Sequence, residues 1–219
     1  ACLMHAGPFG NIAHGNSSIL ADQIALRTSE FVVTEAGFGA DLGFEKFVDI
    51  KCRTSGLKPD AAMIVATVRG LKSHSGKFKI VTGRPLPEAL LVEDLGSLRA
   101  GAENLAKMVS IVAGTGLPAV VAVNRFPTDS DREIDEIRKI ARDAGADAEV
   151  SEAFTKGGEG VKELARAVVK ATEKKSTFKM YYESGASLKE KIEAVATKVY
   201  GAAGVDYTPL AEEKLAQFT

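Results

Sequence analysis

The alternation of short apolar runs with longer amphipathic segments constrains the fold of this chain most. Residues 61–68 (AAMIVATV) and 117–123 (LPAVVAV) are nearly continuous apolar runs, typical of strands buried on both faces of a sheet. Shorter strands are expected at 31–34 (FVVT) and 147–150. Strands that alternate with helices form a mostly parallel sheet with helices on both faces. The predicted fold class is therefore α/β.

Apolar residues at helical spacing predict helices between and after these strands. The expected helices are 17–27, 97–113, 130–144, 161–174, 187–200 and 208–218. Asn16 or Ser17 is expected to cap the first helix, and Asp129 or Ser130 the third. Segment 76–96 contains two prolines and three glycines, which predicts a long surface connection or an insertion.

Composition and charge exclude several classes of protein. The net charge is -1, which argues against a large basic field for nucleic acid. No apolar stretch reaches the roughly 18 residues that span a membrane, and no signal peptide is visible. The two cysteines are expected as free thiols in a reducing compartment, and the three histidines have no metal-ligand spacing. We therefore expect a cytoplasmic protein with no bound metal and with no nucleic-acid or membrane partner.

Three polar or glycine-rich segments follow the expected strands. They are 35–43 (EAGFGADLG), 124–129 (NRFPTD) and 151–160 (SEAFTKGGEG), and each contains one phenylalanine. Ligands of parallel α/β sheets bind beyond the carboxyl ends of the strands. An aromatic face at such a place can stack on a planar ring. These segments are therefore the candidates for a binding site.

The residues alone leave the role of each segment open. Phe38 lies between two glycines that would permit close approach of a ligand, but its ring could also plug the core. Asn124 can read a base edge through its donor and acceptor, and Pro127 fixes a turn. The plainer alternative for this stretch is a joint between a strand and a helix.

A second candidate is an anion site at Lys156, Gly157 and Gly158. These residues precede an expected helix start, where free backbone N–H groups favour an anion, although a flexible helix entry would look the same. Their spacing is not that of a Walker loop, GxxxxGK[ST], and the chain contains no such loop. His14 could transfer a proton or simply close a loop. No catalytic residue is identified.

Read as strings, these segments resemble one family. HAGPFGNIAHG, TEAGFGADLGFEKFVDIKCR, KPDAAMIVATVRGLK, LPAVVAVNRFPTD and SEAFTKGGEG occur in the same order as in formate–tetrahydrofolate ligases, and SLKEKIEAVATKVYGAAGVDYT resembles that family too. The resemblance covers essentially the whole chain and is weakest in 76–96. Members of the family are much longer, and their phosphate loop precedes the region that matches Ala1. The resemblance thus implies an interior piece of such an enzyme.

The implied fold is the mostly parallel sheet of a P-loop-type nucleotide-binding domain, of which 1–125 would be the later part. Residues 126–219 would form a smaller second domain, α/β or α+β, carrying part of a folate or nucleotide ring site. The implied reaction is the ATP-dependent joining of formate to tetrahydrofolate through formyl phosphate, giving 10-formyltetrahydrofolate, ADP and phosphate. The substrates would be MgATP, formate and tetrahydrofolate, and the oligomer a homotetramer.

The resemblance also implies roles for particular residues. Phe126 and Phe154 would sandwich a planar ring, either pterin or adenine, with Asn124 and Pro127 in the same site and Phe38 beside it. The family commonly has tryptophan at the position of Phe154. Two alternatives remain. One is a non-catalytic binding module derived from such an enzyme, since the phosphate loop is missing. The other is a GTPase-like switch suggested by NRFPTD, which the missing lysine and Walker loop disfavour.

Overall fold

The computed structural model of the chain describes residues 2, 3 and 16–219, so His14 lies outside the described residues. The chain divides into two compact units. Pro59–Phe178 form a contiguous unit, here called the sheet unit, and Ala1–Lys58 together with Lys179–Thr219 form the split unit. The domain boundary expected between residues 125 and 126 stays a prediction about the complete protein.

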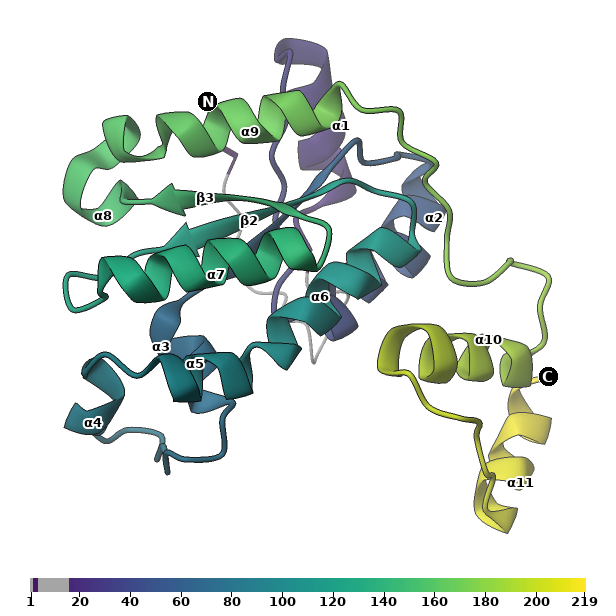
Figure 1. Cartoon of the computed structure of the whole chain (residues 1–219). Coiled ribbons are helices and arrows are strands. Elements are labelled where there is room, and N and C mark those ends of the chain that lie inside the picture. Colours follow the sequence, from purple (N-terminus) through teal and green to yellow (C-terminus); the bar gives the residue numbers. More distant parts are fainter. Residues whose placement is uncertain (1, 4–15) are drawn as a thin grey trace. The chain divides into compact units, whose positions relative to one another are not determined.

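The sheet unit contains three parallel strands in the order β1 (Ala62–Ala66), β2 (Ala119–Asn124) and β3 (Asp147–Ser151) (Figure 1). All three lie where the apolar runs predicted them. Helices connect the strands, because parallel neighbours need long crossover connections. The prediction of an α/β fold with a parallel sheet is confirmed for this unit.

Helices cover both faces of this sheet. Figure 1 shows α9 (Lys162–Thr172) on one side, and α6 (Glu103–Gly114) and α7 (Asp131–Asp143) on the other. Val120 and Ala122 of β2 pack against Leu164 and Ala171 of α9, and β2 is buried almost throughout. Burying a valine side chain stabilises a fold by about 1.5–3 kcal/mol. The central strand therefore anchors the unit, as its apolar run predicted.

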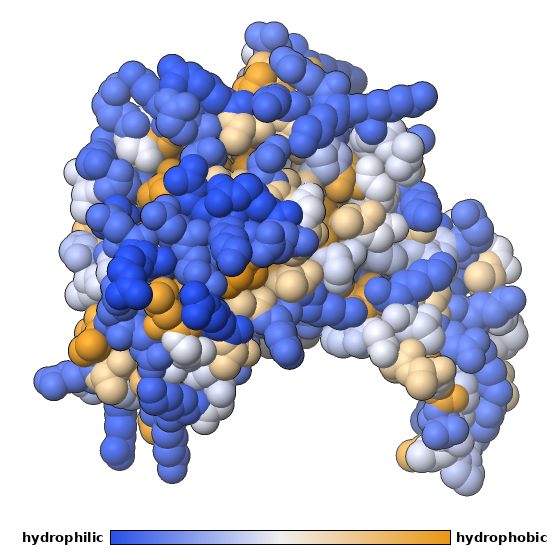
Figure 2. All heavy atoms as spheres, in the orientation of Figure 1, coloured by the Kyte–Doolittle hydropathy of each residue, from blue (hydrophilic) through white to orange (hydrophobic). Residues whose placement is uncertain are grey.

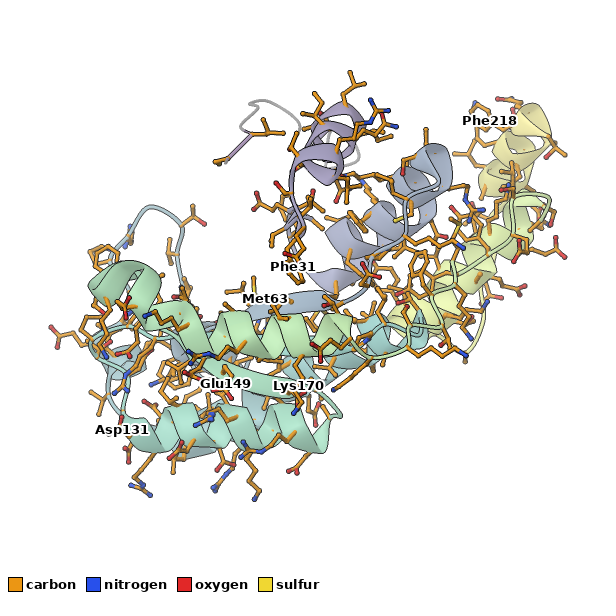
Figure 3. All side chains as sticks on the ribbon, turned by 90° about the horizontal axis from the view of Figure 1, so that it is seen from above. Phe31, Met63, Asp131, Glu149, Lys170 and Phe218 are labelled. Carbon is orange, nitrogen blue, oxygen red and sulfur yellow. The ribbon has the colours of Figure 1, made fainter. Side chains whose placement is uncertain are left out.

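Strand β1 differs from the prediction that both its faces are buried. Met63 and Val65 are 44% and 62% exposed, while Ala66 is buried. Figure 3 labels Met63 on this strand. β1 is an edge strand among the described strands, and α9 packs mainly against β2 and β3. The face of β1 beside α9 therefore lacks a helix of its own, which the apolar sequence could not reveal.

The helices that precede and follow β2 largely match their predicted ranges. Ser130 caps α7 and forms a capping box with Glu133. The outward face of α7 is strongly hydrophilic (Figure 2), as its charged sequence requires. The predicted helix 97–113 is instead two helices, α5 (Leu95–Gly101) and α6, separated at Ala102. A Cβ on Gly101 would lie 1.8 Å from the carbonyl oxygen of Leu71, so α5 approaches the backbone of another element there.

Besides the short helices α8 (Ala153–Lys156) and η3 (Gly157–Val161), two further helices of the sheet unit were not predicted. The first is α3 (Val68–Ser73), which starts directly after β1 and is capped by Thr67. The second is α4 (Glu88–Leu91), the only regular element described within segment 76–96 apart from the start of α5.

The first half of the split unit departs most from prediction. Helix α1 (Ile19–Thr28) is present, but Ser18 caps it rather than Asn16 or Ser17. The strand expected at 31–34 is wrong, because this extended stretch pairs with no described strand. A β-branched run forms a strand only when a partner supplies the hydrogen bonds.

A helical region begins at Ala40, within the glycine-rich segment 35–43. It comprises two π-helical stretches, η1 (Ala40–Phe44) and η2 (Phe47–Cys52), and the short α2 (Arg53–Ser55). It ends at Gly56, whose φ of 73° provides the left-handed stop of a helix.

The second half of the split unit follows its prediction. Helix α10 (Leu188–Ala194) continues into the π-helical η4 (Val195–Tyr200), and α11 (Pro209–Phe218) is capped by Thr208. Within the part of the chain that the structure describes, no helix combines the length and apolar character needed to cross a membrane.

Candidate functional site

The carboxyl ends of β1, β2 and β3 meet at one edge of the sheet, here called the carboxyl edge. Two of the three candidate segments, 124–129 and 151–160, leave the sheet there. Asn124 is paired with Ser151 across the strands, and the Arg125 N–H donates to the Ser151 carbonyl at 3.0 Å. The third segment, 35–43, belongs to the split unit and does not follow a strand. The topological prediction thus holds for two segments.

A tight turn holds Phe126 at the carboxyl edge. The Phe126 N–H donates to Oδ2 of Asp129 at 2.8 Å, and the Asp129 N–H donates to the Phe126 carbonyl at 3.0 Å. Asp129 is buried, and burial raises its pKa although the Phe126 N–H and the Arg69 charge oppose the rise. Pro127 is exposed at the tip of the turn, and Asn124 is half-buried at the strand end. The turn therefore fixes the backbone from which the Phe126 ring projects.

Arg69 from α3 lies over the ring of Phe126. Its Cζ atom is 3.7 Å from the ring centroid, and Nη2 donates a long hydrogen bond of 3.5 Å to Oγ1 of Thr128. A cation at this distance from an aromatic face is a cation–π contact. Sequence reasoning did not select Arg69. The strand-end rule could have found it, because Arg69 follows β1 as Phe126 follows β2.

Phe154 lies on the short helix α8 (Ala153–Lys156), directly after β3, and its side chain is 89% exposed. It therefore fills no core. Whether Phe126 and Phe154 face one another across a gap stays a prediction. Their segments leave neighbouring strands at the same edge of the sheet, which is the arrangement that the prediction requires.

The predicted anion site has an ion pair of its own. The Lys156 ammonium binds Oε2 of Glu152 at 2.6 Å. Gly157 has φ 57° and ψ −141°, a conformation that is essentially restricted to glycine, and it opens the 3₁₀ helix η3 (Gly157–Val161). A Cβ on Gly160 would lie 2.6 Å from the Glu152 carbonyl oxygen. The glycines thus shape a tight loop, and an anion would compete with Glu152 for Lys156.

Phe38, in the split unit, has the only positive φ among the described non-glycine residues, at 64°. Its ring is 65% exposed, so it does not plug a core. A left-handed conformation costs an ordinary residue roughly 1–2 kcal/mol. The turn is also closely packed, since a Cβ on Gly43 would lie 1.5 Å from the carbonyl oxygen of Gly37. The backbone thus holds an exposed aromatic ring in a strained conformation, a feature that clusters at functional sites.

A carboxylate cluster in the split unit was also missed. Asp49 Oδ1 accepts hydrogen bonds from Nη2 of Arg53 at 3.1 Å and from the Tyr181 N–H at 3.2 Å. Burial, and then the neighbouring Asp49, raise the pKa of Glu45 to about 7. Burial raises the pKa of Asp49 as well. The cluster can therefore hold a proton near neutral pH. Among the described residues, no group of three or more His, Cys, Asp or Glu side chains could hold a metal ion.

Comparison with known proteins decides the family. The family model of formate–tetrahydrofolate ligases matches residues 1–219, the whole chain. The chain belongs to the formate–tetrahydrofolate ligase family. The family resemblance predicted from the strings is thus confirmed, and homologues that carry this name are enzymes.

Three curated ligases illustrate the similarity. The formate–tetrahydrofolate ligase of Saccharopolyspora erythraea is 55% identical over 216 residues, which are 99% of this chain and 38% of that protein. The ligase of Desulforamulus reducens is 54% identical over 219 residues, 100% of this chain and 39% of that protein. The ligase of Roseiflexus castenholzii is 55% identical over 217 residues, 99% of this chain and 38% of that protein. The chain therefore spans just over a third of the length of these relatives.

Proposed function

We propose that this chain is part of an enzyme that joins formate to tetrahydrofolate at the expense of ATP. The family match over the whole chain is the observation that carries this proposal. Because the chain spans about 38% of its relatives, the activity is proposed for the complete protein. That protein would be a cytoplasmic homotetramer, in which residues 1–125 belong to a P-loop-type nucleotide-binding domain and residues 126–219 to a smaller second domain.

The proposed reaction has two steps. A formate oxygen attacks the γ-phosphorus of MgATP, and the bond to ADP breaks to give formyl phosphate. N10 of tetrahydrofolate then attacks the formyl carbon, phosphate leaves with the bonding electrons, and N10 loses its proton. Phosphoryl transfer depends on positioning and charge neutralisation. This sequence has no Walker loop, so we assign those tasks to parts of the complete protein outside this chain.

The proposed contribution of this chain is a ring site at the carboxyl edge. Phe126 and Phe154 would enclose a planar heterocycle, either the pterin of tetrahydrofolate or the adenine of ATP. The fixed turn beneath Phe126 and the exposed ring of Phe154 support this role. Asn124 would donate to or accept from the ring edge, and Pro127 would line the site. We also propose a ring-binding role for Phe38 of the split unit, which its exposed ring and its strained backbone conformation support.

Lys156, Gly157 and Gly158 are proposed to bind an anionic group of the substrate. Their support is a cation next to a glycine-restricted loop, directly after the helix that carries Phe154. The Glu152 carboxylate already offsets the charge of the Lys156 ammonium, which predicts weak binding of an anion there. This contact would therefore orient the substrate more than it would hold it.

The test is substitution of each aromatic residue in the complete enzyme. Stacking contributes about 0.5–1.5 kcal/mol beyond burial, so Phe126→Ala or Phe154→Ala should raise KM for tetrahydrofolate or ATP by about 2- to 13-fold. Phe218→Ala is the matched control, because Phe218 is an exposed phenylalanine on α11. Unchanged KM for both substrates in both variants would reject the ring site.

A non-catalytic binding module is the second candidate, and the missing Walker loop favours it. Formate-dependent release of ADP separates the two candidates. The complete protein should release ADP only when formate is present. Absence of this activity in the complete protein, with retained binding of tetrahydrofolate, would support the binding module and reject the ligase.

A further inference from the structure

The position of Arg69 is fixed by local structure at the carboxyl edge. Thr67, the last residue before α3, accepts a hydrogen bond from the Gly70 N–H at 3.0 Å and so defines the first turn. A Cβ on residue 70 would lie 2.7 Å from Oγ1 of Thr67, so glycine permits this close capping contact. The turn begins where β1 ends. Arg69 is therefore delivered to the same edge of the sheet as the Phe126 turn.

The guanidinium of Arg69 closes one face of the Phe126 ring. The separation of 3.7 Å between Cζ and the ring centroid is a van der Waals contact, which a planar guanidinium reaches when it stacks on the ring. Nη2 reaches Thr128 at 3.5 Å, and the buried Asp129 carboxyl lies close enough for the Arg69 charge to oppose the rise of its pKa. The cation is thus held between the ring and the turn that carries the ring.

One atom of Arg69 argues against a purely structural role. Its Nε is buried and has no hydrogen-bond partner among the described residues. A buried donor without a partner works against stability, so such a group calls for an explanation beyond folding. In this orientation the guanidinium stacks on the Phe126 ring, while Nε remains without a hydrogen bond to any residue that the structure describes.

The charge also changes the character of the Phe126 ring face opposite the guanidinium. An aromatic face is electron-rich, and two such faces repel in a direct face-to-face arrangement. A cation on one face attracts the π electrons and reduces the negative potential of the opposite face. The opposite face then accepts parallel stacking with an electron-rich heterocycle more readily than an isolated phenylalanine would.

We infer that Arg69 is a positioning residue of the ring site, which acts through Phe126 by occupying one ring face and leaving the other for a planar, electron-rich substrate ring. This inference rests on the proposed function, because it assumes that Phe126 binds a substrate ring. It adds a residue and a direction of approach, with the substrate on the face opposite the guanidinium.

A double-mutant cycle in the complete enzyme tests the inference. The variants are Arg69→Met, Arg69→Lys, Phe126→Ala and the double variant Arg69→Met/Phe126→Ala, and the readouts are kcat and KM for tetrahydrofolate and ATP. Arg69→Met should raise, by about two- to fivefold, the same KM that Phe126→Ala raises, and should leave kcat unchanged. Arg69→Lys should recover part of the loss, since lysine keeps the charge but not the flat stack. In the Phe126→Ala background, Arg69→Met should have no further effect.

Arg132→Met is the control, because Arg132 is an exposed arginine of the same unit that pairs with Glu93. Thermal unfolding of each variant shows whether it folds, and Arg69→Lys provides a mild substitution if Arg69→Met does not. If Phe126→Ala raises KM but Arg69→Met and Arg69→Lys do not, the inference is overturned and the ring site stands. If the two effects multiply fully, Arg69 acts independently of Phe126 and the inference is again wrong. If Phe126→Ala changes neither KM, the ring site and the inference fall together.

Discussion

Replacing Lys72 by methionine should destabilise the sheet unit far more than the loss of a surface ion pair. Lys72 and Glu133 are each 1% exposed, and their Nζ and Oε1 atoms are 2.9 Å apart. Nζ also donates to the Val92 carbonyl at 2.8 Å, and Oε1 accepts from the Asp94 N–H at 3.1 Å. Oε2 accepts from the N–H and the hydroxyl of Ser130, both at 3.3 Å. The pair thus links α3, the chain before α5 and the start of α7.

The structure sets the size of the effect. Removing one partner of a buried pair costs roughly 3–5 kcal/mol, because the remaining charge is buried without compensation. In Lys72→Met, Glu133 would keep the hydrogen bonds from Asp94 and Ser130, so we expect about 3 kcal/mol. Burial acts to raise the pKa of Glu133, but these bonds and Lys72 outweigh burial and lower it. Glu133→Gln should cost at least as much, because the buried ammonium would lose its counter-charge and the glutamine NH2 group would face the Ser130 N–H in place of an acceptor. The double variant Lys72→Met/Glu133→Gln should cost clearly less than the sum of the two single changes.

Urea unfolding followed by far-UV circular dichroism measures these costs, since the chain contains no tryptophan. Lys77→Met is the matched control, because Lys77 pairs with Asp94 on the surface and its loss should cost below about 1 kcal/mol. The reasoning is refuted if Lys72→Met costs no more than Lys77→Met. It is also refuted if the single costs simply add in the double variant.

Three further perturbations test other parts of the structure. Burial and Asp49 raise the pKa of Glu45 from 4.5 to about 7, so the folded state keeps a proton that the unfolded chain has already released. Stability should therefore fall as pH rises from about 4.5 to 7. Glu45→Gln should flatten this part of a plot of melting temperature against pH. Equal slopes for the wild-type protein and the Glu45→Gln variant would contradict this explanation. Gly116→Ala should destabilise by more than Gly145→Ala in urea unfolding, by at least about 1 kcal/mol. Both glycines have positive φ, but only at Gly116 would a Cβ meet a backbone carbonyl, 2.6 Å away. A larger loss of stability in Gly145→Ala than in Gly116→Ala would count against this reasoning. Phe38→Gly should raise the free energy of unfolding by up to about 1 kcal/mol, because glycine adopts the left-handed conformation without strain. A loss of stability would show that contacts of the Phe38 ring stabilise the fold by more than the backbone strain costs.

The sequence predicted the centre of the sheet well and its margins poorly. β2 is apolar from Ala119 to Val123 and lies between two strands, so pattern and burial agree there. β1 has a similar apolar pattern but lies at an edge, and no local signal distinguishes the two positions. The run at 31–34 has strand propensity but pairs with no strand in the described part of the chain, and partners come from the tertiary structure. The break at Ala102 was missed because apolar spacing continues across a change in helix direction.

In the candidate site, too, the sequence predicted some features and missed others. The segments at 124–129 and 151–160 were located because strand order alone determines where the carboxyl edge lies. Arg69 was missed because a single arginine after a strand has no motif, and its contact with Phe126 joins residues far apart in the sequence. The partners of Asp49 were missed for the same reason, since Tyr181 lies 132 residues further along the chain. Contacts between distant segments carry no local sequence pattern.

The division of the chain into a contiguous and a discontiguous unit has a consequence for the order of folding. The split unit needs contacts of Asp49 and Arg53 with the backbone of Tyr181 and Tyr182, at sequence separations of 132 and 129 residues. During synthesis these contacts wait until the second half has left the ribosome, whereas Pro59–Phe178 can assemble beforehand. Once folded, Pro59–Phe178 no longer form a long flexible loop between the two halves of the split unit. Bringing these halves together then costs less conformational entropy. A nascent chain whose residues up to 178 have left the ribosome could thus carry these three folded strands beside a split unit that is still incomplete.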